Sequence, residues 1–279
     1  TNIGETVFEE CKNLKSITIP SSVTSIMNHA FYNCSSLESV TIPEGVTMIE
    51  FNVFMGCSSL TDISIPSSLT DIGKTVFAGC SSLKNISVDK NNSVYDSRDN
   101  CNAIIKTETN ELISGCSNTT IPYSVTGISE EAFSGCGNLE NIVIPENVVK
   151  IGESAFSGCT GLKSVVIPEK VNEIGENAFM GCTSLTEITI PASVTTIEEA
   201  TFYECSSLKN VIIPDGVNKI ECEAFRSCTS LTEITIPVSV TTIHEEAFLY
   251  CNNLNSITWN ENTYDSLYDF YEAFNAVKK

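Results

Sequence analysis

Hydrophobic and polar positions along this chain follow a pattern that repeats with a fixed period. Its clearest copy is residues 159–181, CTGLKSVVIPEKVNEIGENAFMG, with the skeleton C-x-x-L-x-x-[VI]-x-I-P-x-x-V-x-x-I-x-x-x-A-F-x-x. Phenylalanine recurs at one position of the unit and proline at another, and we call each set of equivalent positions a column. The spacing between successive residues of a column is constant except for one longer spacing, which in the phenylalanine column runs from Phe77 to Phe133. A short fixed period of this kind predicts a solenoid, in which each coil packs only against its neighbours.

Each unit is expected to contain two short extended segments. In the copy above, Val165 and Ile167 alternate with Ser164 and Val166, and this period of two indicates a strand. The proline that follows ends the strand, because proline cannot donate a ladder hydrogen bond. One coil cannot bury its own apolar side chains. Stacked on similar coils at a strand spacing of about 4.8 Å, it would bury them as ladders of like residues.

Residues 89–119 interrupt the repeat. Asp89 stands where a proline is due, and a polar, turn-rich stretch follows it. Residues 103–107 and 111–114 then flank Glu108-Thr109-Asn110, and this pattern predicts a β-hairpin. We expect the hairpin to bulge from the array.

A helical pattern replaces the repeat after Trp259. The residues with helical spacing are Leu267, Phe270, Tyr271, Phe274 and Val277, and Lys278-Lys279 suits a helix C-terminus. We expect a helix that caps the last coil, because an uncovered coil would present an open sheet edge. A helix that docks a partner is the alternative.

The repeat L-x-x-[VI]-x-I-P followed by V-x-x-I-x-x-x-A-F-x-x-C resembles the BspA-like (treponemal-type) leucine-rich repeat family. The resemblance covers residues 3–259 apart from the interruption. It implies a right-handed curved solenoid of 23-residue coils with a parallel β-sheet on its concave face. It also implies a bacterial or protist protein, secreted or on the cell surface, that acts by adhesion or protein recognition. The expected organisation is one solenoid domain over residues 1–279, with N-terminal repeats (1–88), an insertion with a β-hairpin (89–119), C-terminal repeats (120–259) and a capping helix (260–279).

The charge balance narrows the classes of partner. Thirty-five acidic residues against fifteen basic ones give a formal net charge of −20. Such a surface repels phosphate backbones and anionic lipids, so we expect no nucleic-acid partner. No apolar run approaches the roughly 20 residues of a membrane span, so no membrane insertion is expected. The charge either keeps the solenoid soluble, which we favour, or forms an acidic ligand-binding face. Thr1 already lies inside a repeat and no signal peptide is visible, so we expect a fragment of a longer protein.

Thirteen cysteines raise the question of metal sites and disulfides. Ten of them share one repeat position, where parallel side chains do not converge as a disulfide requires. The sequence has no C-x-x-C pair, and His29 and His244 belong to distant coils, so we expect no zinc site. We expect a ladder of buried, reduced thiols instead. A disulfide between Cys101 and Cys116 is left open. Cys222 is expected on the outer surface as the most reactive thiol, although Glu221 and Glu223 should disfavour its thiolate.

The sequence shows no catalytic constellation. Histidines in distant coils cannot share an acid–base site. The sequence also contains no G-x-S-x-G, H-E-x-x-H or glycine-rich phosphate loop. We therefore expect a protein that is not an enzyme, with no catalytic residues, cofactor or metal. An enzymatic site in the insertion is the remaining alternative.

The exposed side of each strand is where the repeat varies. Small hydroxylated residues fill it in the N-terminal half, whereas Val143, Val166 and Ile212 alternate with Glu187 and Glu233 in the C-terminal half. Branched apolar residues beside fixed charges suit a protein-binding patch, although β-branched residues also favour strands on their own account. No aromatic residue falls at these positions, so stacking on sugars or bases is not expected. The expected partner-binding residues are Asn141, Val143, Ser164, Val166, Glu187, Thr189, Asn210, Ile212, Glu233 and Thr235.

These observations predict a non-enzymatic recognition or adhesion module, displayed on a cell surface or secreted. We expect it to bind a protein ligand, such as a host-surface or extracellular-matrix protein, through the concave face. The alternative is a structural spacer that displays another domain. The ligand, the oligomeric state and the source organism are left open.

Overall fold

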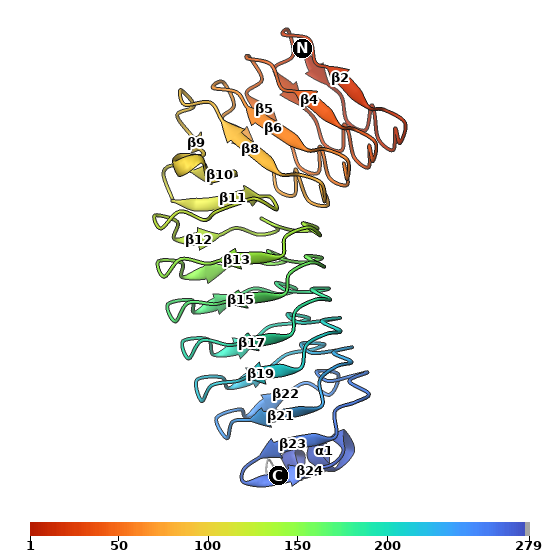
Figure 1. Cartoon of the computed structure of the whole chain (residues 1–279), viewed down its shortest axis with the longest axis vertical. Helices are drawn as coiled ribbons and strands as arrows, with labels where there is room; N and C mark the ends of the chain where they lie inside the picture. Colours follow the sequence, from red (N-terminus) through yellow and green to blue (C-terminus); the bar gives the residue numbers. More distant parts are fainter. Residues whose placement is uncertain (277–279) are drawn as a thin grey trace.

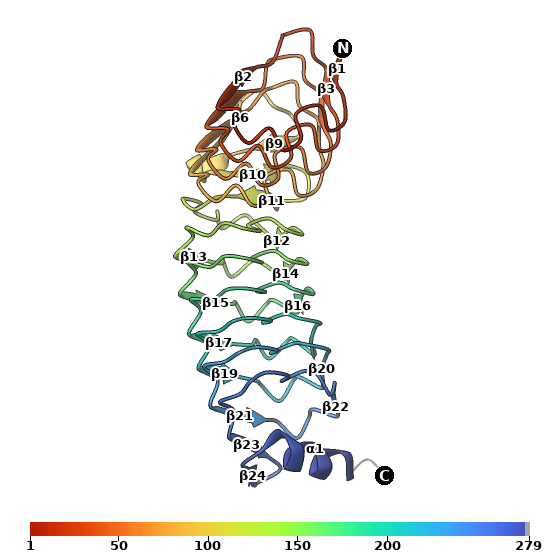
Figure 2. The same cartoon turned by 90° about the vertical axis from the view of Figure 1, so that its right-hand side faces the viewer.

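The computed structural model describes residues 1–276 and confirms the predicted solenoid. Figure 1 shows the coils stacked along one long axis, with the N-terminus at one end and the C-terminus at the other. Strands from the two halves of the repeat lie on different sides of the stack (Figure 2). The direction of stacking changes near the insertion, so that the N-terminal coils are tilted relative to the C-terminal coils (Figure 1).

The first half of each unit forms a strand on one side of the stack, which we call the long-strand face. These strands pair in parallel, and in every pair a residue lies beside its counterpart in the next repeat, as Ser16 lies beside Ser39. They end at or just before the proline column, as predicted. The strands are β2 (Ser16–Thr18), β4 (Ser39–Thr41), β6 (Asp62–Ile65), β8 (Asn85–Val88), β13 (Asn141–Val143), β15 (Ser164–Val166), β17 (Glu187–Thr189), β19 (Asn210–Ile212), β21 (Glu233–Ile236) and β23 (Ser256–Trp259).

The second half of each unit forms a two-residue strand on the other side of the stack. The turn between the two halves is closed by a backbone hydrogen bond, such as Val171 N–H to the Pro168 carbonyl at 3.0 Å. These strands are β1 (Asn2–Ile3), β3 (Ser25–Ile26), β5 (Met48–Ile49), β7 (Asp71–Ile72), β12 (Gly127–Ile128), β14 (Lys150–Ile151), β16 (Glu173–Ile174), β18 (Thr196–Ile197), β20 (Lys219–Ile220) and β22 (Thr242–Ile243).

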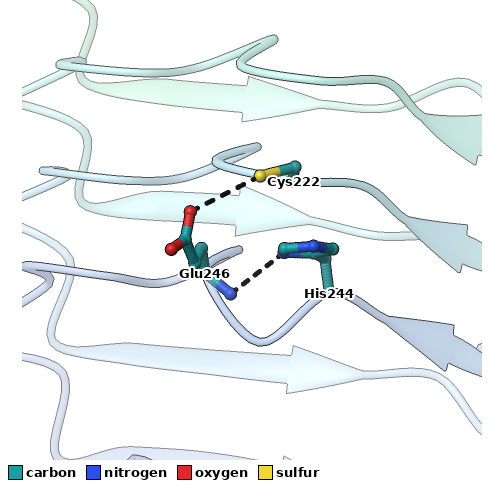
Figure 3. Close-up of side chains that lie close together, drawn as sticks. All are labelled: Cys222, His244 and Glu246. Carbon is teal, nitrogen blue, oxygen red and sulfur yellow. Dashed lines mark hydrogen bonds between the residues drawn. The ribbon is translucent and has the colours of Figure 1, made fainter.

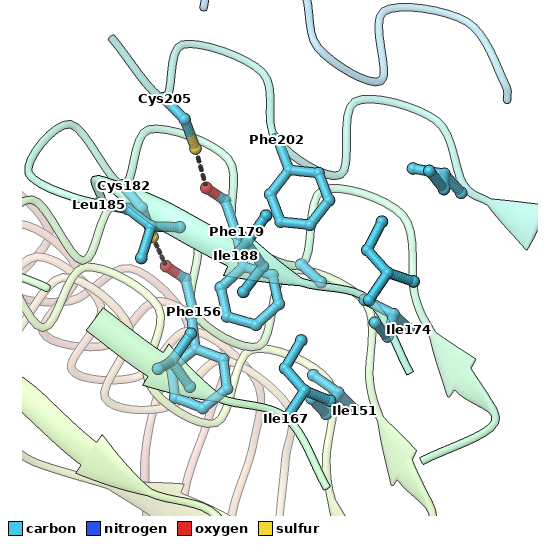
Figure 4. Close-up of a cluster of buried hydrophobic side chains, with 14 of the residues drawn as sticks. Ile151, Phe156, Ile167, Ile174, Phe179, Cys182, Leu185, Ile188, Phe202 and Cys205 are labelled. Carbon is cyan, nitrogen blue, oxygen red and sulfur yellow. Dashed lines mark hydrogen bonds between the residues drawn. The ribbon is translucent and has the colours of Figure 1, made fainter. Parts of the chain in front are cut away.

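Ladders of identical side chains fill the core between the two sets of strands. The rings of Phe156, Phe179 and Phe202 are fully buried and stack nearly parallel, with centroids 5.3 and 5.6 Å apart (Figure 4). Stacked aromatic pairs contribute about 0.5–1.5 kcal/mol beyond the burial of their area. Each coil is therefore completed by the next, as the repeat predicts.

The cysteine ladder does more than fill space. The thiol of Cys182 donates to the carbonyl oxygen of Phe156 in the preceding coil at 3.2 Å, and Cys205 bonds in the same way to Phe179 (Figure 4). Burial raises the pKa of the Cys205 thiol to about 12, which keeps it protonated as a donor. The expectation of buried, reduced thiols is confirmed for this column except at Cys11, which lies in the first coil of this sequence and is exposed. The other ladder cysteines with this bond to a phenylalanine carbonyl are Cys34, Cys57, Cys80, Cys159, Cys228 and Cys251.

The insertion contains the predicted hairpin, but the hairpin does not bulge from the array. Its elements are β9 (Tyr95–Asp96), the 3-10 turn η1 (Arg98–Asn100), β10 (Ala103–Lys106) and β11 (Glu111–Gly115). Strand β10 pairs antiparallel with β9 and β11, and β11 pairs in parallel with β12. The hairpin therefore takes the place of a coil within the stack. The buried side chains of the solenoid form two core clusters, one in the N-terminal coils and one in the C-terminal coils. The hairpin is favourable in this place because Ile104 packs into the N-terminal cluster and Ile105 packs into the C-terminal cluster.

The coils on either side of the hairpin still touch each other on the phenylalanine side. The Gly79 N–H donates to the Ser134 carbonyl at 2.9 Å, and Lys74 Nζ lies 2.6 Å from a carboxylate oxygen of Glu130. Gly115, at the end of β11, lies against the ring of Phe133. This seam, where two core clusters meet across the inserted hairpin, follows directly from the single longer step in the phenylalanine column.

The C-terminal segment caps the last coil, as predicted. Strand β24 (Asn262–Tyr264) pairs antiparallel with β23, and helix α1 (Leu267–Ala276) follows it. Phe270 and Phe274 of the helix are buried, with the Phe274 ring centroid 5.1 Å from that of Trp259. The predicted contribution of Val277, Lys278 and Lys279 lies outside the described residues. Among residues 1–276, no helix has the length and apolar character needed to cross a membrane.

We predict that Gly115→Ala destabilises the seam. A methyl group at this position would overlap Cε1 of Phe133, a ring that is itself buried. Overpacking of this kind costs about 1–3 kcal/mol of unfolding free energy, measurable by urea denaturation. Gly127→Ala is the matched control, because its methyl group would meet Cγ of Glu111 at 3.8 Å, an ordinary contact. Equal stability of the two variants would contradict this description of the seam.

We also predict that alkylation of the native protein modifies Cys11 first. Cys11 is exposed, Cys222 is half-buried with a raised pKa, and the ladder thiols from Cys34 onward are buried. Peptide mass spectrometry after brief iodoacetamide treatment measures the order, with the urea-unfolded chain as the control. Modification of Cys159 at the rate seen in the unfolded chain would rule out the buried ladder.

Candidate binding surface

Two columns of side chains project from the long-strand face between β13 and β21. The polar column lies four residues before each proline position, and the branched column lies two residues before it. All ten residues of the two columns are exposed, in agreement with the sequence-based expectation about their orientation. The polar column is Asn141, Ser164, Glu187, Asn210 and Glu233, and the branched column is Val143, Val166, Thr189, Ile212 and Thr235.

The branched column contains three exposed apolar side chains. Val143 is 82% exposed, Val166 is 78% exposed and Ile212 is 60% exposed. The parallel register places Val143 beside Val166, and Thr189 beside Ile212, at a strand spacing of about 4.8 Å. The buried side of β15 already anchors that strand through Val165, so the exposed valine beside it does not serve the core. Exposed apolar groups that adjoin one another in this way are typical of interaction surfaces.

The face is hollowed in the middle of these columns. One hollow of about 380 Å³ extends over β15 to β19, and another of about 480 Å³ extends over β17 to β23. Glu187, Asn210 and Ile212 line both hollows. Ile212 thus provides an apolar centre, and Glu187 and Glu233 on the neighbouring strands provide fixed negative charge around it.

The N-terminal half of the long-strand face differs in that its polar groups bond to one another. Thr61 donates to one oxygen of Asp62 at 2.6 Å, and Asn85 donates to the other at 2.6 Å. These two hydrogen bonds lower the pKa of the Asp62 carboxyl. The Ser64 and Ser87 hydroxyls are also hydrogen-bonded, at 2.9 Å. Polar side chains that already hydrogen-bond to one another gain little free energy from bonds to a partner. The C-terminal half of the face is therefore the better candidate for a binding surface.

Sequence reasoning missed a second cluster, on the side of the short strands. Cys222, His244 and Glu246 come from adjacent coils, and one donor atom of each lies within 4.8 Å of the others (Figure 3). The Cys222 thiol donates to a carboxylate oxygen of Glu246 at 3.6 Å, and the Glu246 backbone N–H donates to Nδ1 of His244 at 3.2 Å. Burial, followed by the Glu246 carboxylate, raises the pKa of the Cys222 thiol.

The expected position of Cys222 needs correction, because it is half-buried rather than fully on the surface and Cys11 is the more exposed thiol. Its raised pKa, which makes it a poor nucleophile, agrees with the expectation that neighbouring glutamates disfavour its thiolate. A metal site was not expected because the sequence has no C-x-x-C pair and its two histidines lie in distant coils, which leaves out a pairing of His244 with Cys222. The spacing between Cys222 and His244 was the available signal, because it is just short of one full repeat and places the two residues on adjacent coils.

The disulfide left open between Cys101 and Cys116 is not formed in this structure. Both cysteines are free and buried, and they belong to different core clusters.

Comparison with solved structures identifies similar solenoids in bacteria. A leucine-rich repeat protein from Eubacterium ventriosum is 26% identical with a TM-score of 0.66, over 95% of this chain and 85% of that one. A leucine rich cell surface protein from Faecalibacterium prausnitzii is 28% identical with a TM-score of 0.56, over 94% and 83% of the two chains. A leucine-rich repeat protein from Bacteroides ovatus is 30% identical with a TM-score of 0.53, over 93% and 76%.

The family assignment comes from the repeat itself. The search of curated proteins finds no match. The family model of the BspA type leucine rich repeat region, which describes 6 copies of the repeat, matches residues 1–109, 100–205 and 172–276. These matches span both arrays, the inserted hairpin and the C-terminal cap. The chain therefore belongs to the BspA-type leucine-rich repeat family.

Proposed function

We propose that this protein is a non-enzymatic recognition or adhesion module that binds a protein partner through the branched and polar columns of β13 to β21. The observation that carries the proposal is the row of exposed branched side chains, centred on Val166 and Ile212, beside fixed carboxylates. Apolar centres flanked by charged groups are the usual composition of protein interfaces. Because the columns stand on paired strands, little conformational freedom is lost when a partner binds.

A protein is the partner class that this surface fits best. The net charge of −20 opposes nucleic acid and anionic lipid. The ten column residues include no aromatic ring on which a sugar or a base could stack. The carboxylates of Glu187 and Glu233 favour a partner that presents lysine or arginine around an apolar group.

Display on a bacterial surface, or secretion, is the setting we propose. One of the similar structures is described as a leucine rich cell surface protein. A partner would then be a protein of a host surface or of the extracellular matrix. The alternative, a structural spacer that carries another domain, predicts no dependence of binding on the two columns.

We predict that the double variant Val166→Lys, Ile212→Lys loses partner binding and keeps its melting temperature. Both side chains are exposed, so the core does not change, whereas a lysine in a desolvated interface centre removes a contact of about 2 kcal/mol or more. That loss corresponds to about 30-fold in affinity for each site. The measurement is retention of proteins from host-surface and bacterial-surface extracts by the immobilised chain.

The matched control is Thr18→Lys, Thr41→Lys. These residues occupy the same repeat position in β2 and β4, so the control adds the same charge to the N-terminal half of the same face. Binding lost in both double variants would indicate a general charge effect. Binding retained by the Val166 and Ile212 variant would contradict the proposed site and favour the spacer.

A further inference from the structure

The cluster of Cys222, His244 and Glu246 lies where two adjacent outer turns face each other. Cys222 follows β20, and His244 and Glu246 follow β22, the next short strand in the stack. Figure 3 shows the three side chains converging between these turns. The stack therefore holds their backbones at one coil spacing, and only the side chains have freedom to adjust.

Cys222 is an exception within its own column. The corresponding position in the other coils from residue 130 onward is glutamate: Glu130, Glu153, Glu176, Glu199 and Glu245. Cys222 thus replaces a carboxylate inside a row of carboxylates, and Glu199, Glu223 and Glu246 exert their negative charge on it. Such surroundings attract a cation. The thiol and the imidazole select a softer ion than the calcium or magnesium that carboxylates alone would bind.

We propose that Cys222, His244 and Glu246 form a binding site for a Zn²⁺ ion. Thiolate, imidazole and carboxylate are the three donor types that zinc takes in proteins, and three protein ligands leave a fourth position for water. Zinc–ligand bonds of about 2.0–2.3 Å place the donor atoms roughly 3.5 Å apart. Atoms that already lie within 4.8 Å of one another need side-chain adjustments of about 1 Å to reach that separation. The Cys222 thiol gives its proton to solvent as the ion binds.

The local hydrogen bonds prepare the histidine for this role. Nδ1 of His244 accepts a hydrogen bond from the Glu246 backbone N–H at 3.2 Å, and this bond holds the imidazole beside the residue that supplies the carboxylate. Ligation through Nδ1 would require this hydrogen bond to break, whereas ligation through Nε2 would leave it in place. The His244 backbone is itself held by the capping helix, because the Tyr271 hydroxyl donates to the His244 carbonyl at 3.0 Å. The cap thus supports the turn that carries two of the three ligands.

The test is a titration of the full chain, kept reduced, with Zn²⁺ in competition with a chromophoric chelator. We expect one high-affinity equivalent in the wild type. Loss of a supporting partner of a zinc ligand already costs about 10- to 100-fold in affinity, so Cys222→Ser and His244→Ala should each weaken binding at least as much. The matched controls are Cys11→Ser, which removes the exposed ladder thiol, and His29→Ala, which removes the other histidine.

Cobalt gives a second readout that depends on direct ligation. We expect the Co²⁺-loaded wild type to show a thiolate-to-metal charge-transfer band that is absent from Cys222→Ser and retained in Cys11→Ser. Zinc affinity that is the same in the wild type and in the two site variants would overturn the proposal, as would a charge-transfer band that persists without Cys222. The outcome is independent of partner binding by the long-strand face, since the cluster lies on the side of the short strands.

Discussion

A single coil of the repeat cannot bury its own apolar side chains, and the rest of the structure depends on this constraint. Burial comes only from the neighbouring coils, so the rings of Phe156 and Phe179 stack face to face, and buried ladder thiols such as Cys182 donate to a carbonyl of the preceding coil. The last coil is covered by a different element. At the C-terminal end, Trp259 is covered by Phe270 and Phe274 of the cap. In the first coil of this sequence, Cys11 is exposed.

The same constraint separates residues that hold the fold from residues that are free to serve a partner or a ligand. On β15 the buried Val165 packs in the core, while Val166 points away from it. At the outer turns, one column is glutamate from residue 130 onward except at Cys222. The proposed protein-binding surface and the proposed zinc site thus occupy positions that the stack does not use, on different sides of the molecule.

Much of the fold could be predicted because the period, the proline column and the apolar spacing of the last segment are local signals. The hairpin was predicted from its turn, but its place inside the stack depends on the parallel pairing of β11 with β12, which no local pattern encodes. The orientation of Val166 and Ile212 followed from the alternation along their strands. The proximity of Cys222 and His244 was missed. Their spacing in the sequence is just short of one repeat, and it brings them together only because the two residues lie on adjacent coils. The exposure of Cys11 was missed because all ten cysteines of the ladder were expected to be equally buried.

The central claim is that the branched column of the C-terminal coils, and not the solenoid as a whole, contacts the partner. Site-specific photocrosslinking tests it most directly, with a benzophenone side chain placed at residue 166 in one chain and at residue 41 in another. Both sites share a repeat position and are exposed, so they differ only in their half of the face. We expect a covalent adduct with a discrete surface protein from residue 166 and none from residue 41. Equal adducts from both sites, or an adduct from residue 41 alone, would contradict the claim.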